Sequence, residues 1–143
     1  MFYFSLQSVL NYRKQIEEKL MLDFADTKRR LYCEKELLEK MKKERADLIS
    51  CVKRMGENQM RSSDAANYFS YINFIKDAEN NQEEVVSKVE KELEEKRIEL
   101  ISASRKRKVL EIIKEKELKE YRQSLIIREQ KELDEIGILR VRV

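Results

Sequence analysis

The sequence predicts an all-α protein in which two long helices fold back on each other as an antiparallel coiled-coil hairpin. The chain of 143 residues contains no proline and only two glycines, so residues that interrupt helices are nearly absent. Charged residues make up 41% of the chain, against roughly 25% in typical globular domains, which leaves little material for a compact core. Apolar residues account for another 41% and recur at regular spacing, which favours helix over disorder.

The first helix is predicted to run from about residue 5 to about residue 58. Steps that alternate between four and three residues meet apolar side chains at eight of eleven positions, which is the heptad spacing of a coiled-coil seam. These eleven positions are Leu20, Phe24, Thr27, Leu31, Glu34, Leu38, Met41, Arg45, Leu48, Val52 and Met55. The same stripe can be followed back through Ile16, Arg13, Val9 and Leu6.

A reversal is predicted at residues 56–64, GENQMRSSD. This stretch contains Gly56 and ends in Ser62, Ser63 and Asp64, residue types that cap the start of a helix. A charged amphipathic helix needs a second apolar stripe to pack against, and folding back supplies one within the chain. A parallel dimer of single long helices is the alternative, but it gives residues 56–64 no purpose.

The second helix is predicted to run from about residue 64 to about residue 136, followed by a tail at residues 137–143. Its seam should contain Val86, Val89, Leu93, Lys96, Leu100, Ala103, Arg107 and Leu110. Continuing to Leu125 requires two consecutive steps of four, a stutter that unwinds the supercoil locally. Beyond Leu125 the register is ambiguous, so the end of this helix is expected to leave its partner and face something else. The whole chain is thereby predicted to be one elongated α-hairpin, its helices unequal in length.

The composition argues against catalysis. The chain has no histidine to act as a general base, and its two glycines cannot form a phosphate-binding loop. Cys33 and Cys51 lie about 27 Å apart along one helix, too far for a disulfide, and read best as small apolar residues of a reducing compartment. We therefore expect no enzymatic activity, no metal and no cofactor. With no secretory signal and no spanning segment, the protein is expected in the cytoplasm.

Two clusters are candidate binding surfaces. Arg105 to Lys108 could contact phosphates, but four consecutive residues point around most of a helical turn, so a solvated flank is the better interpretation. Residues 68–75 carry six aromatic or apolar side chains that one facing helix cannot easily cover. They form either a locally thicker core or a surface that binds a partner.

Three stretches together resemble the bacterial flagellar export protein family FliJ. They are F-x-L-x-x-V-L-x-Y-R (Phe4, Leu6, Val9, Leu10, Tyr12, Arg13), N-Y-x-x-Y-I-x-F-I (Asn67 to Ile75) and R-E-Q-K-E-L-D-E (Arg128 to Glu135). The resemblance covers essentially the whole chain. It implies a soluble coiled-coil hairpin similar to the central stalk of rotary ATPases.

The resemblance also implies a role in the flagellar type III export apparatus. Family members bind the hexameric export ATPase (FliI), promote its ring assembly, contact the cytoplasmic domain of the export-gate protein FlhA and help recycle export chaperones. The protein would then be needed for flagellum assembly and motility, and would associate peripherally with the inner face of the cell membrane. No nucleic-acid partner is implied.

The resemblance extends to individual residues. Because a hairpin brings both termini to one end, the predicted ATPase contacts combine Leu6, Val9, Leu10 and Arg13 with Arg128, Gln130, Lys131, Leu133 and Asp134. The predicted export-gate contacts are Tyr71, Phe74 and Ile75. Residues 137–143 match no family feature; Arg140 and Arg142 lie either near anionic lipid or in a frayed end.

Three other functions remain open from the sequence. The equivalent stalk of a virulence type III secretion system would share the hairpin. A plain structural or dimerising coiled coil would tolerate surface substitutions at residues 68–75 and 128–135. A nucleic-acid binder would show strongly salt-dependent retention on duplex DNA.

Overall fold

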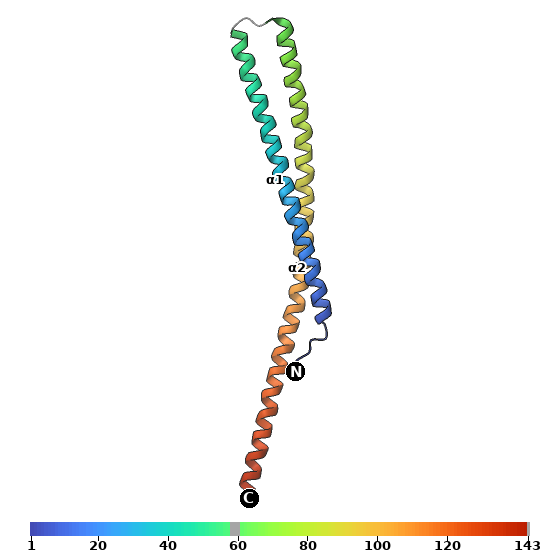
Figure 1. The fold of residues 1–143 in the computed structure, drawn as a ribbon. Coiled ribbons are helices and arrows are strands. Elements are labelled where there is room, and N and C mark those ends of the chain that lie inside the picture. The colour runs from blue at the N-terminus through green and yellow to red at the C-terminus, as the bar shows by residue number, and fades with distance from the viewer. Residues whose placement is uncertain (58–60, 143) are drawn as a thin grey trace. The chain divides into compact units, whose positions relative to one another are not determined.

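The computed structural model describes residues 1–57 and 61–142, and contains two helices, α1 (Gln7–Glu57) and α2 (Ser62–Arg142). Most of the predicted reversal therefore lies within the described chain, whereas its central residues 58–60 lie outside it. The two helices pack against each other in opposite directions (Figure 1), so the predicted antiparallel hairpin is confirmed. Two compact units can be distinguished, and each is described by itself.

The first unit, here called the turn unit, contains residues Met21–Glu99. Its apolar core consists of Leu31 and Leu38 from α1 and Val86 and Val89 from α2, with Leu93 packed against them. All of these are seam positions predicted from heptad spacing. Of the predicted α1 seam from Leu20 to Met55, every residue except Met55 is buried or half-buried. Hydrophobic periodicity therefore located this interface correctly.

Polar pairs flank that apolar core. The side-chain amide of Gln82 donates hydrogen bonds to the backbone carbonyl of Glu34, at 3.0 Å, and to the Glu34 carboxylate. Arg45 forms an ion pair with the buried carboxylate of Glu79, at 3.2 Å between Nε and Oε1. Such pairs form in only one alignment of the two helices, so they fix the register that apolar contacts alone would leave loose.

The second unit, here called the terminal unit, contains residues Met1–Leu20 and Leu100–Val143, of which Val143 lies outside the described residues. The start of α1 packs on α2 through Leu10, the most deeply buried side chain, which is 1% exposed. The sequence predicted Leu6 and Val9 in this seam, and that prediction was wrong: both are more than one-third exposed, while Leu10 and Glu17 face α2. The physical reason is a polar contact. Glu17 faces α2 because it pairs with Arg107, and Leu10, one heptad before Glu17, then faces α2 as well.

The helix ends also differ from prediction at one point. The sequence predicts that the second helix ends near residue 136, but α2 continues to Arg142. Gly137 therefore lies inside the helix, where a single glycine costs only about 1 kcal/mol relative to alanine. Strong helix formers on both sides outweigh that cost. The first turn of α2 contains Asp64 and its last turn contains Arg140 and Arg142, charges that suit the respective ends of the helix dipole.

Candidate partner-binding site

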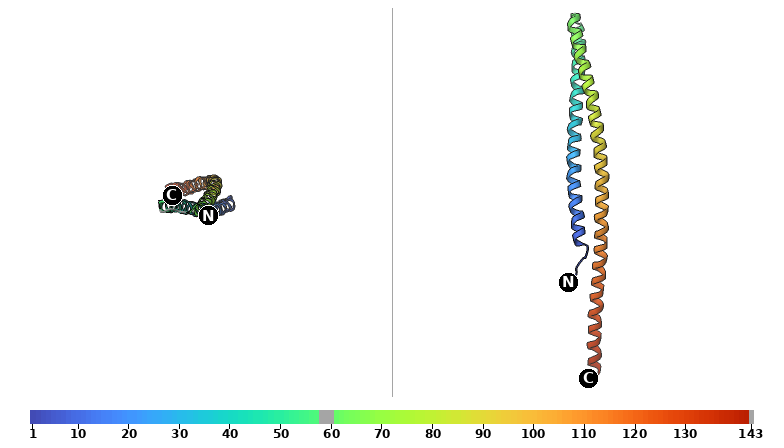
Figure 2. Two further views of the ribbon diagram at one scale, coloured as in Figure 1. Left: turned by 90° about the horizontal axis from the view of Figure 1, so that it is seen from above. Right: turned by 90° about the vertical axis from the view of Figure 1, so that its right-hand side faces the viewer.

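The terminal unit contains a helical segment that nothing in the described chain covers. The N-terminal residues make their last contacts at Tyr121, whose hydroxyl accepts a hydrogen bond from the Met1 amino group at 2.9 Å and whose ring lies 5.6 Å from that of Phe2. Every residue of α2 from Arg122 to Arg142 is exposed. Figure 2 shows this segment continuing beyond the start of α1 as a single helix. We call residues 122–142 the free segment.

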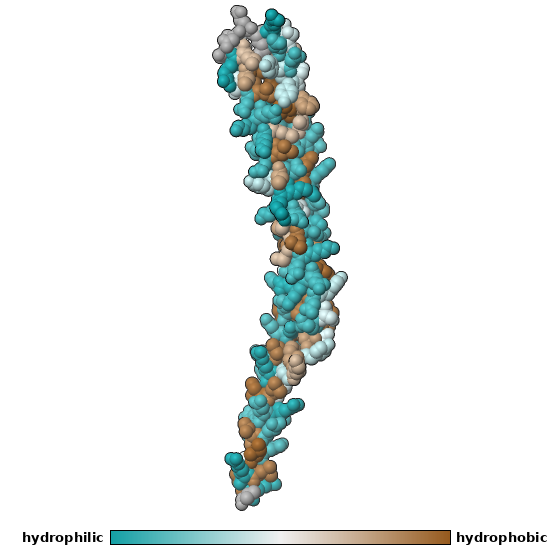
Figure 3. Space-filling model, viewed as in Figure 1, coloured by the Kyte–Doolittle hydropathy of each residue, from teal (hydrophilic) through white to brown (hydrophobic). Residues whose placement is uncertain are grey.

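The free segment exposes many large apolar side chains to water. Eight of its side chains are large hydrophobics, and each is at least 36% exposed. They are Leu125, Ile126, Ile127, Leu133, Ile136, Ile138, Leu139 and Val141. In Figure 3 they appear as brown patches along the C-terminal end of α2. Exposed apolar surface of this extent is typical of a binding site.

These apolar side chains point in most directions around the helix. Successive helical residues are about 100° apart, so Leu125, Ile126 and Ile127 span about 200° of the circumference. Ile138 and Leu139 extend this arc to about 260°. The remaining arc carries polar residues such as Arg128 and Lys131. A helix with apolar side chains around most of its circumference is normally surrounded by protein. A flat partner or a single partner helix would leave part of this surface in water. The geometry therefore suits a partner that encloses the free segment.

The free segment also has charges in three successive bands. Arg122 and Arg128 come first, four acidic residues with Lys131 follow within residues 129–135, and Arg140 and Arg142 come last. No ion pair is formed by these side chains within the described residues. They are therefore available to orient an incoming partner along the helix axis.

The structure separates the two halves of the predicted ATPase contact. Arg128, Gln130, Lys131, Leu133 and Asp134 all lie in the free segment and are exposed. By contrast, the start of α1 is level with the part of α2 around Lys114, whose ammonium donates a hydrogen bond to Gln7 at 2.7 Å. Residues 128–134 lie 14 to 20 residues further along α2, which is about 21–30 Å at 1.5 Å per residue.

The four N-terminal candidates differ among themselves. Leu6 and Val9 offer exposed apolar surface, and Arg13 is half-buried. Leu10 belongs to the core between the helices and has no surface to offer a partner. A single small patch thus cannot contain both halves of the prediction, and the free segment is the better defined of the two.

The three predicted export-gate residues lie near the start of α2 in the turn unit, and they differ in solvent exposure. Phe74 is 68% exposed, and Tyr71 stacks beside it at 6.4 Å between ring centroids. Ile75 is 5% exposed and packs between the helices. The core interpretation is therefore correct for Ile75, whereas Phe69, Tyr71 and Phe74 remain on the surface, and binding of a partner there stays a prediction.

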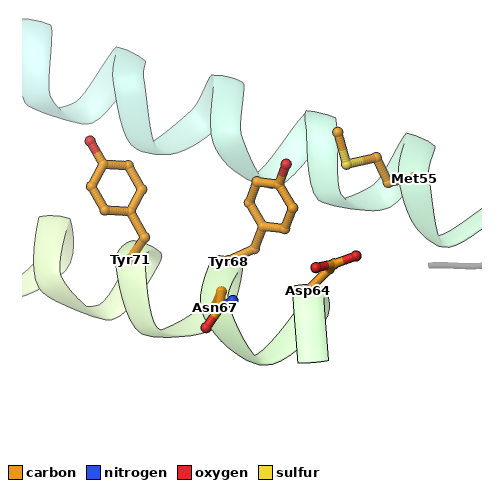
Figure 4. A pocket seen from close by; sticks show the side chains of 5 residues that line it. All are labelled: Met55, Asp64, Asn67, Tyr68 and Tyr71. Carbon is orange, nitrogen blue, oxygen red and sulfur yellow. The ribbon is translucent and has the colours of Figure 1, made fainter. Parts of the chain in front are cut away.

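Tyr71 is held in place by α1. Its hydroxyl donates a hydrogen bond to the Glu44 carboxylate at 3.2 Å. The negative charge of Glu44, and then this hydrogen bond, raise the pKa of Tyr71 above 10.0, because both oppose formation of a phenolate. Closer to the turn, Tyr68 and Tyr71 both point toward α1 (Figure 4) and line an open cavity of about 570 Å³ together with Met55, Asp64 and Asn67.

A polar layer that sequence reasoning missed joins the helices of the terminal unit. The guanidinium of Arg107 contacts the carboxylates of both Glu17 and Glu111, and Ser104 donates a hydrogen bond to Glu17 at 3.3 Å. Glu17 and then Glu111 raise the pKa of Arg107, since both stabilise its charged form. The available signal was Arg107 itself, because a cation at a predicted seam position requires a carboxylate from the facing helix.

The described residues also lack what a metal site, a disulfide or a membrane span requires. They contain no group of side chains arranged to hold a metal ion, and both cysteines are free thiols. Neither helix, as far as it is described, has a stretch long and apolar enough to cross a bilayer. The fold and its free segment thus define a class: two-helix hairpin proteins in which one helix extends uncovered beyond the other.

Comparison with known proteins identifies the family within that class. The profile of the family described as "Flagellar FliJ protein" matches residues 2–143, so the chain belongs to the flagellar FliJ family. A solved structure described as a YscO homologue, CT670, from Chlamydia trachomatis is similar at a TM-score of 0.65 and 24% identity, over 97% of this chain and 94% of that one. A search of curated proteins gives no match. The resemblance read from the three sequence motifs is confirmed.

Family membership defines the role in general terms. The protein is a component of the type III export apparatus, and its partners belong to that apparatus. The family consists of structural export components and not of enzymes.

Proposed function

We propose that this protein is the stalk subunit of the flagellar export ATPase: it binds the ATPase ring, promotes its assembly and links it to the export gate. One observation carries this proposal, namely that the free segment is uncovered and has exposed apolar side chains around most of its circumference. A hexameric ring with a central opening is a partner that can enclose such a helix. The banded charges would set how far the helix enters.

The mechanism is differential binding. A helix that contacts several ATPase subunits at once binds the assembled ring better than separated subunits, so it shifts the equilibrium toward the ring. If ATP turnover requires the assembled ring, a larger fraction of assembled ring gives more turnover. The protein itself needs no catalytic group for this effect.

The test is ATP turnover by the cognate export ATPase against concentration of this protein. Wild type should stimulate turnover, and Gln130→Ala/Asp134→Lys should require about tenfold more protein for the same stimulation, as expected when interface contacts near the centre are lost. Gln15→Ala/Asp47→Lys is the matched control, since it makes the same chemical changes at exposed positions outside the free segment. Absence of stimulation by wild type, with ring assembly also unchanged, would refute the proposal.

For the export gate, we propose that Phe74 and Tyr71 make the contact and that Ile75 supports them from the core. Phe74→Ala should weaken binding to the cytoplasmic domain of FlhA, measured by calorimetry. Phe69→Ala is the control, because Phe69 is similarly exposed but points about 140° away from Phe74 around the helix. Equal effects of the two substitutions would contradict the assignment.

Further parts of the proposal rest on family membership alone: assistance in recycling export chaperones, location in the cytoplasm with peripheral association at the flagellar base, and a requirement in motility. A virulence-type stalk is the second candidate, and the similarity to the YscO homologue favours it to the extent that the fold is shared. Stimulation of a virulence-type ATPase but not of a flagellar one would decide for that alternative.

A further inference from the structure

The terminal unit has a second apolar stripe on α2, on the side that faces away from α1. Leu110 and Lys114 face α1 and are half-buried. Ile112 lies two residues from each of them, so it points about 160° away from both. It is 64% exposed, as befits the opposite face of the helix.

This second stripe has heptad spacing. Steps of four and three residues from Arg105 pass through Val109, Ile112, Lys116, Lys119 and, one heptad later, Ile126, and all six are exposed. We call these six residues the outer stripe. A second helix can pack on a helix face with heptad spacing, because this spacing keeps the apolar residues in line along a supercoil. In this part of the terminal unit, α2 is therefore suited to lie between two helices.

The outer stripe is basic. Four cations lie in it or at its edge, Arg105, Lys108, Lys116 and Lys119, against two carboxylates at its edges, those of Glu115 and Glu120. None of these four cations forms an ion pair in the described part of the chain, although Arg107 beside them is paired twice. Four exposed cations without ion-pair partners are hydrated in the free protein. They favour a partner surface that carries negative charge.

We propose that the outer stripe binds an acidic amphipathic α-helix of another protein, with apolar residues at heptad positions and Glu or Asp beside them. The partner's apolar residues would pack on Val109, Ile112 and Ile126. Its carboxylates would face Arg105, Lys116 and Lys119. Five of its six residues lie outside the free segment, and only Ile126 falls within it, so the outer stripe is largely separate from the surface proposed for the ATPase ring.

Two other occupants fit less well. A second copy of the chain using the same stripe would place Lys116 and Lys119 against basic residues of its partner, which is repulsive. An anionic bilayer requires a broad apolar face with cations at its margins. Here Lys116 and Lys119 interrupt the apolar line in its middle, where a lipid surface would have to bury them and a facing helix can pair them with carboxylates.

The test uses two synthetic helical peptides of about four heptads, identical in their apolar stripe, one flanked by Glu and the other by Lys. The full-length protein should bind the Glu peptide at least tenfold more tightly, by fluorescence anisotropy. Lys116→Glu/Lys119→Glu should reverse that preference. Lys88→Glu/Lys91→Glu, a matched control with the same i,i+3 spacing at exposed positions of the turn unit, should leave it unchanged.

The apolar part of the site is tested separately. Ile112→Ser should weaken binding of the Glu peptide, whereas Leu22→Ser, at a side chain 66% exposed in the turn unit, should not. Circular dichroism checks that helix content is the same in all variants. The proposal is overturned if both peptides bind equally or neither binds. It is also overturned if the same variants govern binding to anionic vesicles in place of the peptide, or if sedimentation shows a dimer that Ile112→Ser dissociates.

Discussion

Two regions of α2 have similar residues and opposite surroundings. In residues 79–93 of the turn unit, Val86 and Val89 are buried against Leu31 and Leu38 of α1. The free segment, residues 122–142 of the terminal unit, contains more large apolar side chains, eight in all, and buries none of them within the described chain. The more apolar region is thus the uncovered one. Packing within the described chain does not explain these apolar residues, whereas the proposed partner would.

The largest expected effect separates the two regions by stability. Leu38→Ala removes a buried side chain from a thin core and should lower the free energy of unfolding by about 2–3 kcal/mol. Leu133→Ala, at a side chain 67% exposed, should change it by no more than about 0.5 kcal/mol. Urea denaturation followed by circular dichroism measures both. If Leu133→Ala were equally destabilising, the free segment would be part of a core and the contrast would disappear.

A smaller effect is expected for the polar pairs of the turn unit. Arg45→Ala leaves the Glu79 carboxylate buried without its cation and should cost about 2 kcal/mol, an estimate reduced because Arg45 is itself one-third exposed. Lys35→Ala breaks the pair with Glu90, in which both side chains are half-exposed, and should cost less than about 0.5 kcal/mol.

The double variant Arg45→Met/Glu79→Leu sharpens this prediction. Replacing both charges by apolar side chains of similar size should restore most of the stability lost in Arg45→Ala. The same variant should loosen the register of the two helices, detectable by disulfide trapping of engineered cysteine pairs one heptad apart. A double variant as unstable as Arg45→Ala would show that burial of Glu79 is not the source of the cost.

The smallest expected effect concerns the ionisation of Tyr71. Glu44 raises the pKa of Tyr71 above 10.0, so this pair stabilises the fold below the pKa of an unperturbed tyrosine and ceases to do so as pH rises through the pKa of Tyr71 in the folded protein. Glu44→Gln should lower the pKa of Tyr71 toward 10.0 and remove that alkaline component of unfolding. Carbon-13 NMR of labelled tyrosine can follow the single ring. An unchanged titration would mean that Glu44 and Tyr71 are not in contact in solution.

The sequence was sufficient for the seam and insufficient where polar side chains decide the packing. Leu31, Leu38, Val86 and Val89 follow from heptad spacing because that pattern is local and depends on helix geometry alone. Burial of Leu10 in place of the predicted Val9 could not be derived from heptad spacing. It depends on Glu17 reaching Arg107, a contact between residues 90 positions apart.

The candidate sites show the same limit. The departure of residues 128–135 from the seam was visible in the sequence, because no regular step beyond Leu125 continues the stripe. The separation of these residues from Leu6 and Val9 was not, because it depends on how far α2 extends past the start of α1. Likewise, the aromatic density at residues 68–75 was visible, but only the packing shows that Ile75 is covered and Phe74 is not.

The uncovered end of α2 also has a consequence for the cellular abundance of the protein. Apolar side chains such as Leu139 and Val141 lie in water until another surface covers them, and segments of this kind are the ones that chaperones and proteases bind. A copy without a partner thus exposes a site for its own removal, whereas a bound copy hides it. Synthesis in excess of the partner would be corrected by turnover, so that the abundance of the protein follows the number of partner assemblies.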